Sequence, residues 1–232
     1  MNYIERSLEK RIKEYLQPNK VVIILGARRV GKTELIKHLL EEIDEKAMIL
    51  NGEDQDVHLA LQDRSVRNYK QLLNTTKLLV IDEAQAIPEI GLKLKLMVDS
   101  IEGLKILVTG SSVFDLDNQL GEPLVGRSYT FKLFPLAQIE LAARENYMET
   151  RGSLNSRLIY GGYPELVHLP TNEKKESYLK EQVNSYLLKD ILAFEGVRKQ
   201  AKIVALLRLI AFRVGSEISM ESIGKDLDLN KS

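Results

Sequence analysis

Cysteine is absent from this 232-residue sequence, which excludes a disulfide scaffold, a thiolate metal site and a cysteine nucleophile. An excess of charge of one sign is absent as well. Thirty-three basic residues balance 33 acidic ones, so no global field can hold the protein on nucleic acid or on an anionic membrane. Any contact of that kind must use a local patch.

Long apolar runs are also missing, and none approaches the roughly 20 residues that a membrane span requires. The N-terminal segment, Met1 to Glu14, has a charged helical pattern rather than the basic and then apolar order of a secretory signal. The composition, 44% hydrophobic and 28% charged, is ordinary for a globular protein with a real core. We therefore expect a soluble, cytoplasmic protein without membrane contact.

Short apolar runs alternate with helical patterns in the first part of the chain. Four runs, 21–25, 47–50, 78–81 and 106–108, have the continuous apolar character that is typical of strands in a parallel sheet buried on both faces. A fifth strand is expected at 129–133. Helical patterns lie between them, notably at 32–43 and 92–101. This alternation predicts an α/β fold with three layers and right-handed crossovers.

After Pro135 the strand patterns stop and helical ones follow. The expected helices are 136–150, 153–160, 177–195 and 198–213, with turns at 161–164 and 170–176. A short helix at 219–227 is typical of the opening of a helix-turn-helix unit that stops before its second helix. We predict three domains, at 1–135, 136–195 and 196–232, and expect the sequence to be a piece of a longer protein.

A P-loop pattern, glycine, four residues and then Gly-Lys-Thr, follows the first expected strand directly and precedes a helix. In such a loop, backbone N–H groups and the helix dipole hold phosphate oxygens, Lys32 reaches the β and γ phosphates, and Thr33 ligates magnesium. The alternative is a plain glycine turn between a strand and a helix. The residues predicted to bind the nucleotide are Gly26, Ala27, Arg28, Arg29, Val30, Gly31, Lys32, Thr33 and Glu34.

Two carboxylates, Asp82 and Glu83, follow the expected strand 78–81 without a gap. Parallel strands present their carboxyl ends at one edge of the sheet, so both residues should lie near the P-loop. There Asp82 can hold the magnesium sphere, and Glu83 can orient and deprotonate the attacking water. The alternative is a solvated loop start.

Small hydroxyl residues, Thr109, Ser111 and Ser112, end the expected strand 106–108. They are suited to sensing the γ-phosphate or to holding the water between loop and carboxylates, and Ser111 is the one we assign to the nucleotide. Serine and threonine at strand ends also serve as turn or cap residues, so that alternative stays open.

The segments 26–33, 78–85 and 108–112, together with Gly126-Arg127 and Gly162-Tyr163-Pro164, resemble a family of bacterial and archaeal proteins. These are the AAA-related (AAA+ or STAND-like) P-loop ATPases, whose core is followed by a helical lid and a C-terminal domain of unknown function. The resemblance spans essentially the whole chain.

The resemblance implies a five-stranded sheet in the order 5-1-4-3-2, which puts the Thr109 strand between the P-loop strand and the Asp82 strand. It further implies that Arg127 is a catalytic arginine finger, on its own or a neighbour's nucleotide, and that Pro164 sits in the lid against the nucleotide. A surface ion pair is the alternative for Arg127. Relatives continue through a winged-helix-like region, inside which this chain stops.

Weaker candidates are the three histidines, His38, His58 and His168, which lack the spacing of metal ligands and are interpreted as structural or solvated. The helical part is locally basic, which leaves contact with DNA or a protein through the C-terminal region as an alternative to a merely solvated face.

Together these features predict an ATPase that hydrolyses ATP to ADP and phosphate with Mg²⁺, coupled to lid movement, in a chain that can form a homo-oligomer. The rival from another class is a nucleotide-gated switch or DNA-binding module with negligible turnover. Glu83 favours the enzyme, because a pure switch needs no base.

Overall fold

The chain divides into two compact units, Met1–His168 and Leu169–Ser232, in a computed structural model that describes residues 3–110, 123–187, 200–217 and 219–226. The domain boundaries predicted at 135 and 195 stay predictions.

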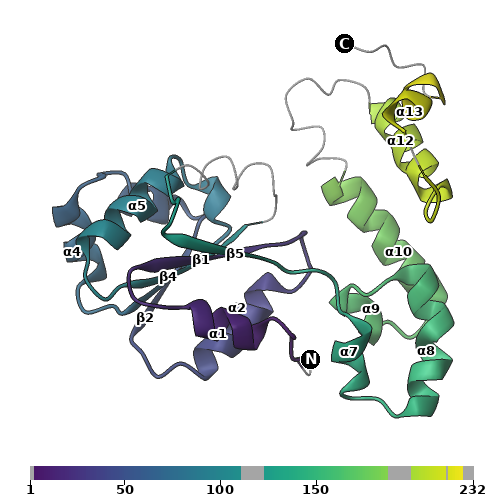
Figure 1. Cartoon of the computed structure of the whole chain (residues 1–232), viewed down its shortest axis with the longest axis horizontal. Coiled ribbons are helices and arrows are strands. Elements are labelled where there is room, and N and C mark those ends of the chain that lie inside the picture. Colours follow the sequence, from purple (N-terminus) through teal and green to yellow (C-terminus); the bar gives the residue numbers. More distant parts are fainter. Residues whose placement is uncertain (1–2, 111–122, 188–199, 218, 227–232) are drawn as a thin grey trace. The chain divides into compact units, whose positions relative to one another are not determined.

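The first unit carries the sheet and most helices (Figure 1). Its elements are α1 (Glu9–Tyr15), β1 (Lys20–Leu25), α2 (Lys32–Glu41), β2 (Ala47–Asn51), α3 (Gln55–Ala60), α4 (Val66–Leu73), β3 (Leu78–Asp82), η1 (Ala84–Ala86), α5 (Ile90–Ser100), β4 (Lys105–Gly110), β5 (Ser128–Lys132), α7 (Gln138–Ala142), α8 (Tyr147–Tyr160) and α9 (Pro164–His168).

The five strands form one parallel sheet in the order β2-β3-β4-β1-β5. This is the predicted order read from the other side, so the prediction is confirmed. In particular, β4 lies between β1 and β3, and the residues that end these three strands meet at one edge of the sheet.

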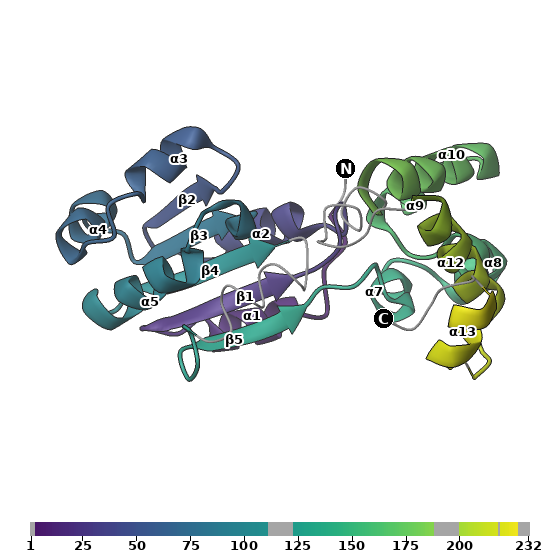
Figure 2. The same ribbon diagram turned by 90° about the horizontal axis from the view of Figure 1, so that it is seen from above.

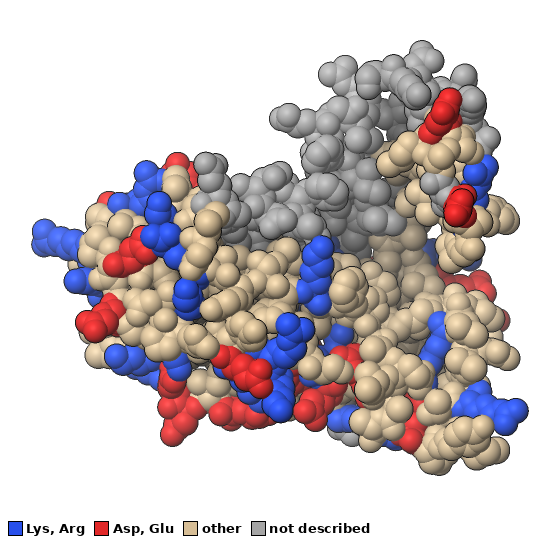
Figure 3. Space-filling model, in the orientation of Figure 1, with Lys and Arg blue, Asp and Glu red and all other residues tan. Residues whose placement is uncertain are grey.

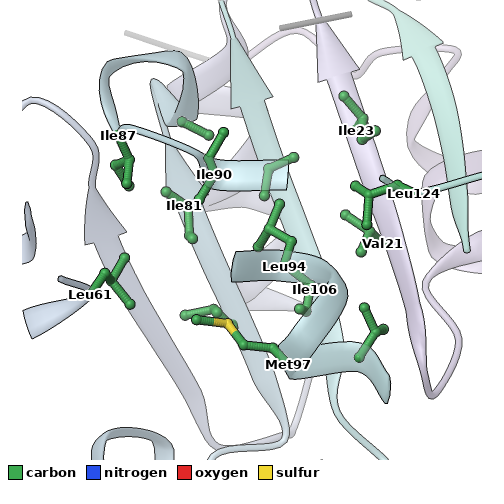
Figure 4. Packing of buried hydrophobic residues seen from close by; sticks show 14 of the residues in the cluster. Val21, Ile23, Leu61, Ile81, Ile87, Ile90, Leu94, Met97, Ile106 and Leu124 are labelled. Atoms are coloured by element: carbon green, nitrogen blue, oxygen red, sulfur yellow. The ribbon is translucent and has the colours of Figure 1, made fainter. Parts of the chain in front are cut away.

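Apolar side chains on the two faces of the central strands build two separate cores. Figure 2 shows the ribbon of the sheet and its helices from above. One core joins the sheet to α3, α4 and α5, where Leu94 and Met97 lie against Val21 and Ile106 (Figure 4). The other joins it to α1 and α2 through residues such as Ile12 and Leu35. Burial on both faces explains the continuous apolar runs of β1, β3 and β4.

β2 differs from the prediction of a strand buried on both faces. Its residues alternate between exposed and half-buried, and the Ile49 side chain is 62% exposed. The reason is its place at the edge of the sheet, next to β3 alone. A sequence pattern of four apolar residues cannot reveal that position.

The helices after Pro135 begin and end at places other than those predicted. The predicted break after residue 150 is wrong, because α8 runs through it with Gly152 in its interior. The chain breaks earlier, where the Asn146 side chain accepts a hydrogen bond from the Glu149 N–H and Glu149 bonds back to the Asn146 N–H. This reciprocal capping box starts α8.

The second unit contains α10 (Asn172–Gln182), the π-helical turn η2 (Val183–Leu187), α12 (Gln200–Phe212) and α13 (Met220–Asp226). The Thr171 hydroxyl accepts from the Lys174 N–H and so starts α10 inside the predicted turn. The second helix of a helix-turn-helix unit would follow α13 and lies outside the described residues. In the described part of the chain, none of the helices is long and apolar enough to cross a membrane.

Candidate functional site

The loop 26–31 leaves β1 at the carboxyl edge of the sheet and leads directly into α2. Its path is tight at both ends. A Cβ on Gly26 would lie 2.6 Å from the Leu133 carbonyl oxygen, and Gly31 has a φ of 102°, which favours glycine. Arg29 also adopts a left-handed backbone, with φ 60°. These conformations turn the chain sharply between β1 and α2, as a phosphate-binding loop requires.

Lys32 is buried, and its ammonium reaches back over the loop. Its Nζ donates to the carbonyl oxygens of Gly26 and Ala27, at 3.0 and 3.4 Å. Of the other predicted residues, Arg28, Arg29 and Val30 lie in the loop, Thr33 follows in the first turn of α2, and Glu34 is exposed and pairs with Lys37 at 2.7 Å.

The carboxylates of Asp82, which ends β3, and of Glu83, which follows it, contact the first two residues of α2. The Thr33 hydroxyl donates to Asp82 Oδ2 at 2.7 Å, and Lys32 Nζ lies 3.5 Å from Glu83 Oε1. The structure therefore brings together four side chains that the sequence separates by about 50 positions, at the edge where open α/β sheets bind ligands.

Thr109, at the end of β4, ties the two carboxylate residues to each other. Its hydroxyl donates to Asp82 Oδ1 and accepts from the Glu83 N–H at 3.1 Å. Glu83 itself has a left-handed backbone, with φ 52°, and its Oε2 accepts from the Gln85 amide at 2.6 Å. The Glu83 carboxylate is thus held on one side by Gln85 and on the other by Lys32.

The sequence analysis missed Gly52, which follows β2 and passes directly against the Glu83 backbone. The Gly52 N–H donates to the Asp82 carbonyl oxygen at 2.7 Å, and the Gly52 carbonyl accepts from His58 Nε2 at 2.6 Å. A Cβ on Gly52 would overlap the Glu83 carbonyl oxygen and lie 2.9 Å from its carbonyl carbon. The signal in the sequence is a glycine two residues after the expected strand 47–50, which indicates close backbone approach.

A second residue that the sequence analysis missed is Arg6. It precedes α1, is 4% exposed, and donates through Nη1 to the Val30 carbonyl in the loop at 3.0 Å. An arginine in a charged N-terminal segment carries no pattern that would single it out.

The turn 162–164 lies beside the loop as well, and both Pro164 and Arg6 approach Gly31. The Leu136 N–H donates to the Gly162 carbonyl at 2.7 Å, and the Pro164 ring lies 3.7 Å from where a Gly31 Cβ would be. Tyr163 stands between Gly162 and Pro164 in the chain. Burial raises the pKa of its phenol, which therefore stays protonated. Pro164 is therefore placed beside the loop.

Arg127 lies far from this edge. It precedes β5, whose Ser128 pairs with Val21, so Arg127 lies beside the start of β1. The six residues of β1 separate this position from Gly26. At about 3.3 Å per residue that is about 20 Å, more than an arginine side chain spans. Arg127 instead pairs with Asp99 at 2.7 Å. Action on the nucleotide of its own chain does not fit this position, whereas action on a neighbour's stays a prediction. Ser111, also predicted, lies outside the described residues.

His38 and His58 have structural partners, and that of His58 is the Gly52 carbonyl. His38 Nδ1 lies 2.9 Å from Glu9 Oε2 and 3.6 Å from Glu42 Oε1, and its ring stacks on Tyr3. Glu42 is also bound by Lys13. Basic and acidic side chains are interspersed over the face drawn in Figure 3, consistent with the neutral net charge.

Comparisons with known proteins agree with this geometry. A family described as an AAA domain matches residues 18–142, and a domain of unknown function matches residues 151–232. Uncharacterized proteins of Methanocaldococcus jannaschii and Haemophilus influenzae are 25% and 23% identical over 93% and 97% of this chain. The matches cover 52% and 58% of those two proteins, so the chain spans about half the length of the curated relatives it matches.

Among solved structures, a Walker-type ATPase of Pyrococcus abyssi has a similar fold, with a TM-score of 0.62 and 17% identity over 98% of this chain and 90% of that one. This likeness concerns the fold. The family match covers more than half of the sequence and includes the loop, the two carboxylates and the sheet that presents them. The chain therefore belongs to the AAA domain family of P-loop ATPases, with a C-terminal domain of unknown function.

Proposed function

We propose that this chain binds ATP with Mg²⁺ at the loop 26–31 and hydrolyses it to ADP and phosphate. The observation that carries the proposal is the meeting of loop and carboxylates: Thr33 Oγ1 lies 2.7 Å from Asp82 Oδ2, and Lys32 Nζ lies 3.5 Å from Glu83 Oε1. Membership of the AAA domain family supports nucleotide binding at the family level.

The residues fit a magnesium ion and a triphosphate. Thr33 and Asp82 offer one hydroxyl and one carboxylate oxygen already in contact, and oxygen is the ligand type that Mg²⁺ prefers. The ion, when bound, supplies charge neutralisation at the β and γ phosphates. The loop offers backbone N–H groups and the start of α2, whose dipole favours an anion.

Lys32 and Glu83 have complementary tasks in this proposal. The Lys32 ammonium now bonds to two carbonyl oxygens of its own loop, which are weaker partners than phosphate oxygens. As Lys32 turns to the phosphates, Glu83 Oε1 becomes available to accept a proton from water. Thr109 keeps the Glu83 backbone in register with Asp82 during this exchange.

The turn 162–164 supports the proposed coupling to lid movement. Pro164 lies against Gly31, and Gly162 is bonded to Leu136, so a shift of the loop is transmitted to the start of the helical segment. The predicted lid, 136–195, would then follow the state of the nucleotide.

A second candidate is a switch that binds ATP and turns over negligibly, with DNA or a protein as its partner. One observation favours it: both oxygens of Glu83 are engaged, one by Gln85 and one by Lys32. A base held in this way stays inactive until another event releases it.

Steady-state phosphate release and calorimetry with MgATP separate the two candidates. We expect the parent to bind and hydrolyse ATP, Lys32→Ala to lose binding, and Glu83→Gln to bind normally with turnover lower by about 10²- to 10⁴-fold. A parent that binds MgATP but releases no phosphate, with or without duplex DNA, would favour the switch. Binding by Lys32→Ala as tight as that of the parent would refute the site.

A further inference from the structure

Arg6 is a buried cation at the back of the phosphate-binding loop. Its side chain is 4% exposed, and its guanidinium contacts three separate elements. Nη1 donates to the Val30 carbonyl at 3.0 Å, Nη2 donates to the Phe134 carbonyl, and Nε lies 3.3 Å from Glu140 Oε2. A buried charge is costly unless it is paired and hydrogen-bonded, so these contacts fix the guanidinium in place.

The segment around Arg6 is anchored at both ends. The Arg6 N–H donates to Glu9 Oε1 at 2.7 Å, and the Tyr3 hydroxyl donates to the same oxygen at 2.6 Å. Burial first, and then the hydrogen bond to Glu9, raise the pKa of Tyr3, so its phenol remains a donor. On the other side, the Ser7 N–H donates to Glu140 Oε1 at 2.8 Å. These hydrogen bonds hold the backbone around Arg6 in place, so its side chain is fixed relative to the loop.

The contact with Val30 has a consequence for the neighbouring amide. Val30 lies between two left-handed residues, Arg29 and Gly31, and the peptide that joins Val30 to Gly31 is trans. In a trans peptide the C=O and the N–H point in opposite directions. A guanidinium that holds the Val30 carbonyl therefore holds the Gly31 N–H pointing away from Arg6.

We propose that Arg6 is a positioning residue of the phosphate-binding loop, which orients the Val30–Gly31 peptide so that the Gly31 N–H faces the phosphate. The inference rests on the proposed nucleotide binding and adds a residue outside the loop motif. Without Arg6, the Val30 carbonyl is free to rotate inward, where a carbonyl dipole repels a phosphate.

The arginine fork, and not its charge alone, is what this role needs. The two terminal nitrogens of one planar group donate to two different carbonyls, while Nε lies at ion-pair distance from the Glu140 carboxylate. Lysine offers a compact ammonium with the same charge and no such fork. Arg6→Lys should therefore resemble Arg6→Ala in its effect on the loop.

The test compares MgADP binding to the full chain by calorimetry in the parent, Arg6→Ala, Arg6→Lys and the control Arg157→Ala. Arg157 is a matched control because it forms a half-buried pair with Glu145 in the same unit and donates to Gln138 Oε1, and neither partner belongs to the loop 26–31. We expect parental affinity in Arg157→Ala and affinity weaker by about tenfold in both Arg6 variants, the scale of one lost charge-assisted hydrogen bond. Parental affinity in Arg6→Lys or Arg6→Ala would overturn the inference.

Hydrogen exchange without nucleotide supplies a second readout that separates this inference from the proposed function. Faster exchange confined to the amides of residues 28–31 in Arg6→Ala, with α5 protected as in the parent, supports local positioning. Exchange equal to the parent in the loop, or equally raised everywhere, overturns it. A parent that binds no MgADP would instead refute the proposed function, while the exchange experiment still decides what Arg6 does to the loop.

Discussion

Gly52 offers a sharp test of whether the Glu83 backbone must hold its place for turnover. Replacing Gly52 by alanine adds one carbon 2.9 Å from the Glu83 carbonyl carbon and 3.1 Å from the Asp82 carbonyl oxygen, where ordinary contact begins at 3.4 Å. The neighbouring atoms are backbone, so no flexible side chain can yield. Gly52 has no left-handed φ, and the effect is therefore one of space alone.

Relief of this overlap requires a shift of about 1 Å, and a misplacement of that size near the chemistry can lower the rate by about 100-fold. We expect Gly52→Ala to lose turnover by about this factor, because Glu83 moves, while MgATP binding through the loop 26–31 is nearly unchanged. The assay is steady-state phosphate release beside calorimetry, with circular dichroism to establish that the variant is folded.

Gly152→Ala is the matched control, because a Cβ on Gly152 meets no atom within 4 Å and the residue lies inside α8. It should leave turnover unchanged and stabilise the helix by about 0.5–1 kcal/mol. A folded Gly52→Ala chain that hydrolyses ATP at the parental rate would refute the reasoning that the end of β2 sets the position of Glu83.

Three further predictions concern other residues. Asp82→Asn should raise the Mg²⁺ concentration needed for half-maximal turnover by about tenfold or more, which a magnesium titration measures; an unchanged requirement would argue against a role at the metal. Arg127→Ala should slow turnover, and mixing it with Lys32→Ala should restore part of the rate if the arginine serves a neighbour; unchanged turnover at every protein concentration excludes the finger. Burial raises the pKa of Tyr69 to about 12 from its usual 10, so the folded state keeps a proton that the unfolded chain releases. Stability should then fall as pH rises from 10 to 12, and urea midpoints at pH 9 and 11 should show a smaller fall in Tyr69→Phe; an equal fall would contradict the assignment.

Most of the sheet could be predicted because its central strands are buried on both faces, and strands of this kind consist of unbroken apolar runs. The same rule failed for β2, since an edge position depends on strand order and not on local composition. The start of α8 shows a different limit. Asn146 and Glu149 match the sequence pattern of a capping box, which marks the start of a helix. The helical pattern that continues across them indicated instead a single helix over 136–150.

The candidate site was predictable where its residues belong to local motifs, as Lys32 and Asp82 do. It was not predictable where a distant segment supplies the contact. Gly52 and Arg6 act through space on Glu83 and Val30, and nothing in their immediate neighbours in sequence records those partners. Arg127 shows the converse, because its position before β5 was read correctly while the edge of the sheet at which it lies follows only from the parallel register.

The left-handed backbones of Arg29 and Glu83 mean that the protein is not built for maximal stability. A non-glycine residue in this conformation costs roughly 1–2 kcal/mol, and both of these residues lie where the loop meets the carboxylates. Glycine at position 83 would relieve the strain and remove the carboxylate with it. At position 83 the backbone of lowest strain and the proposed catalytic side chain therefore exclude each other.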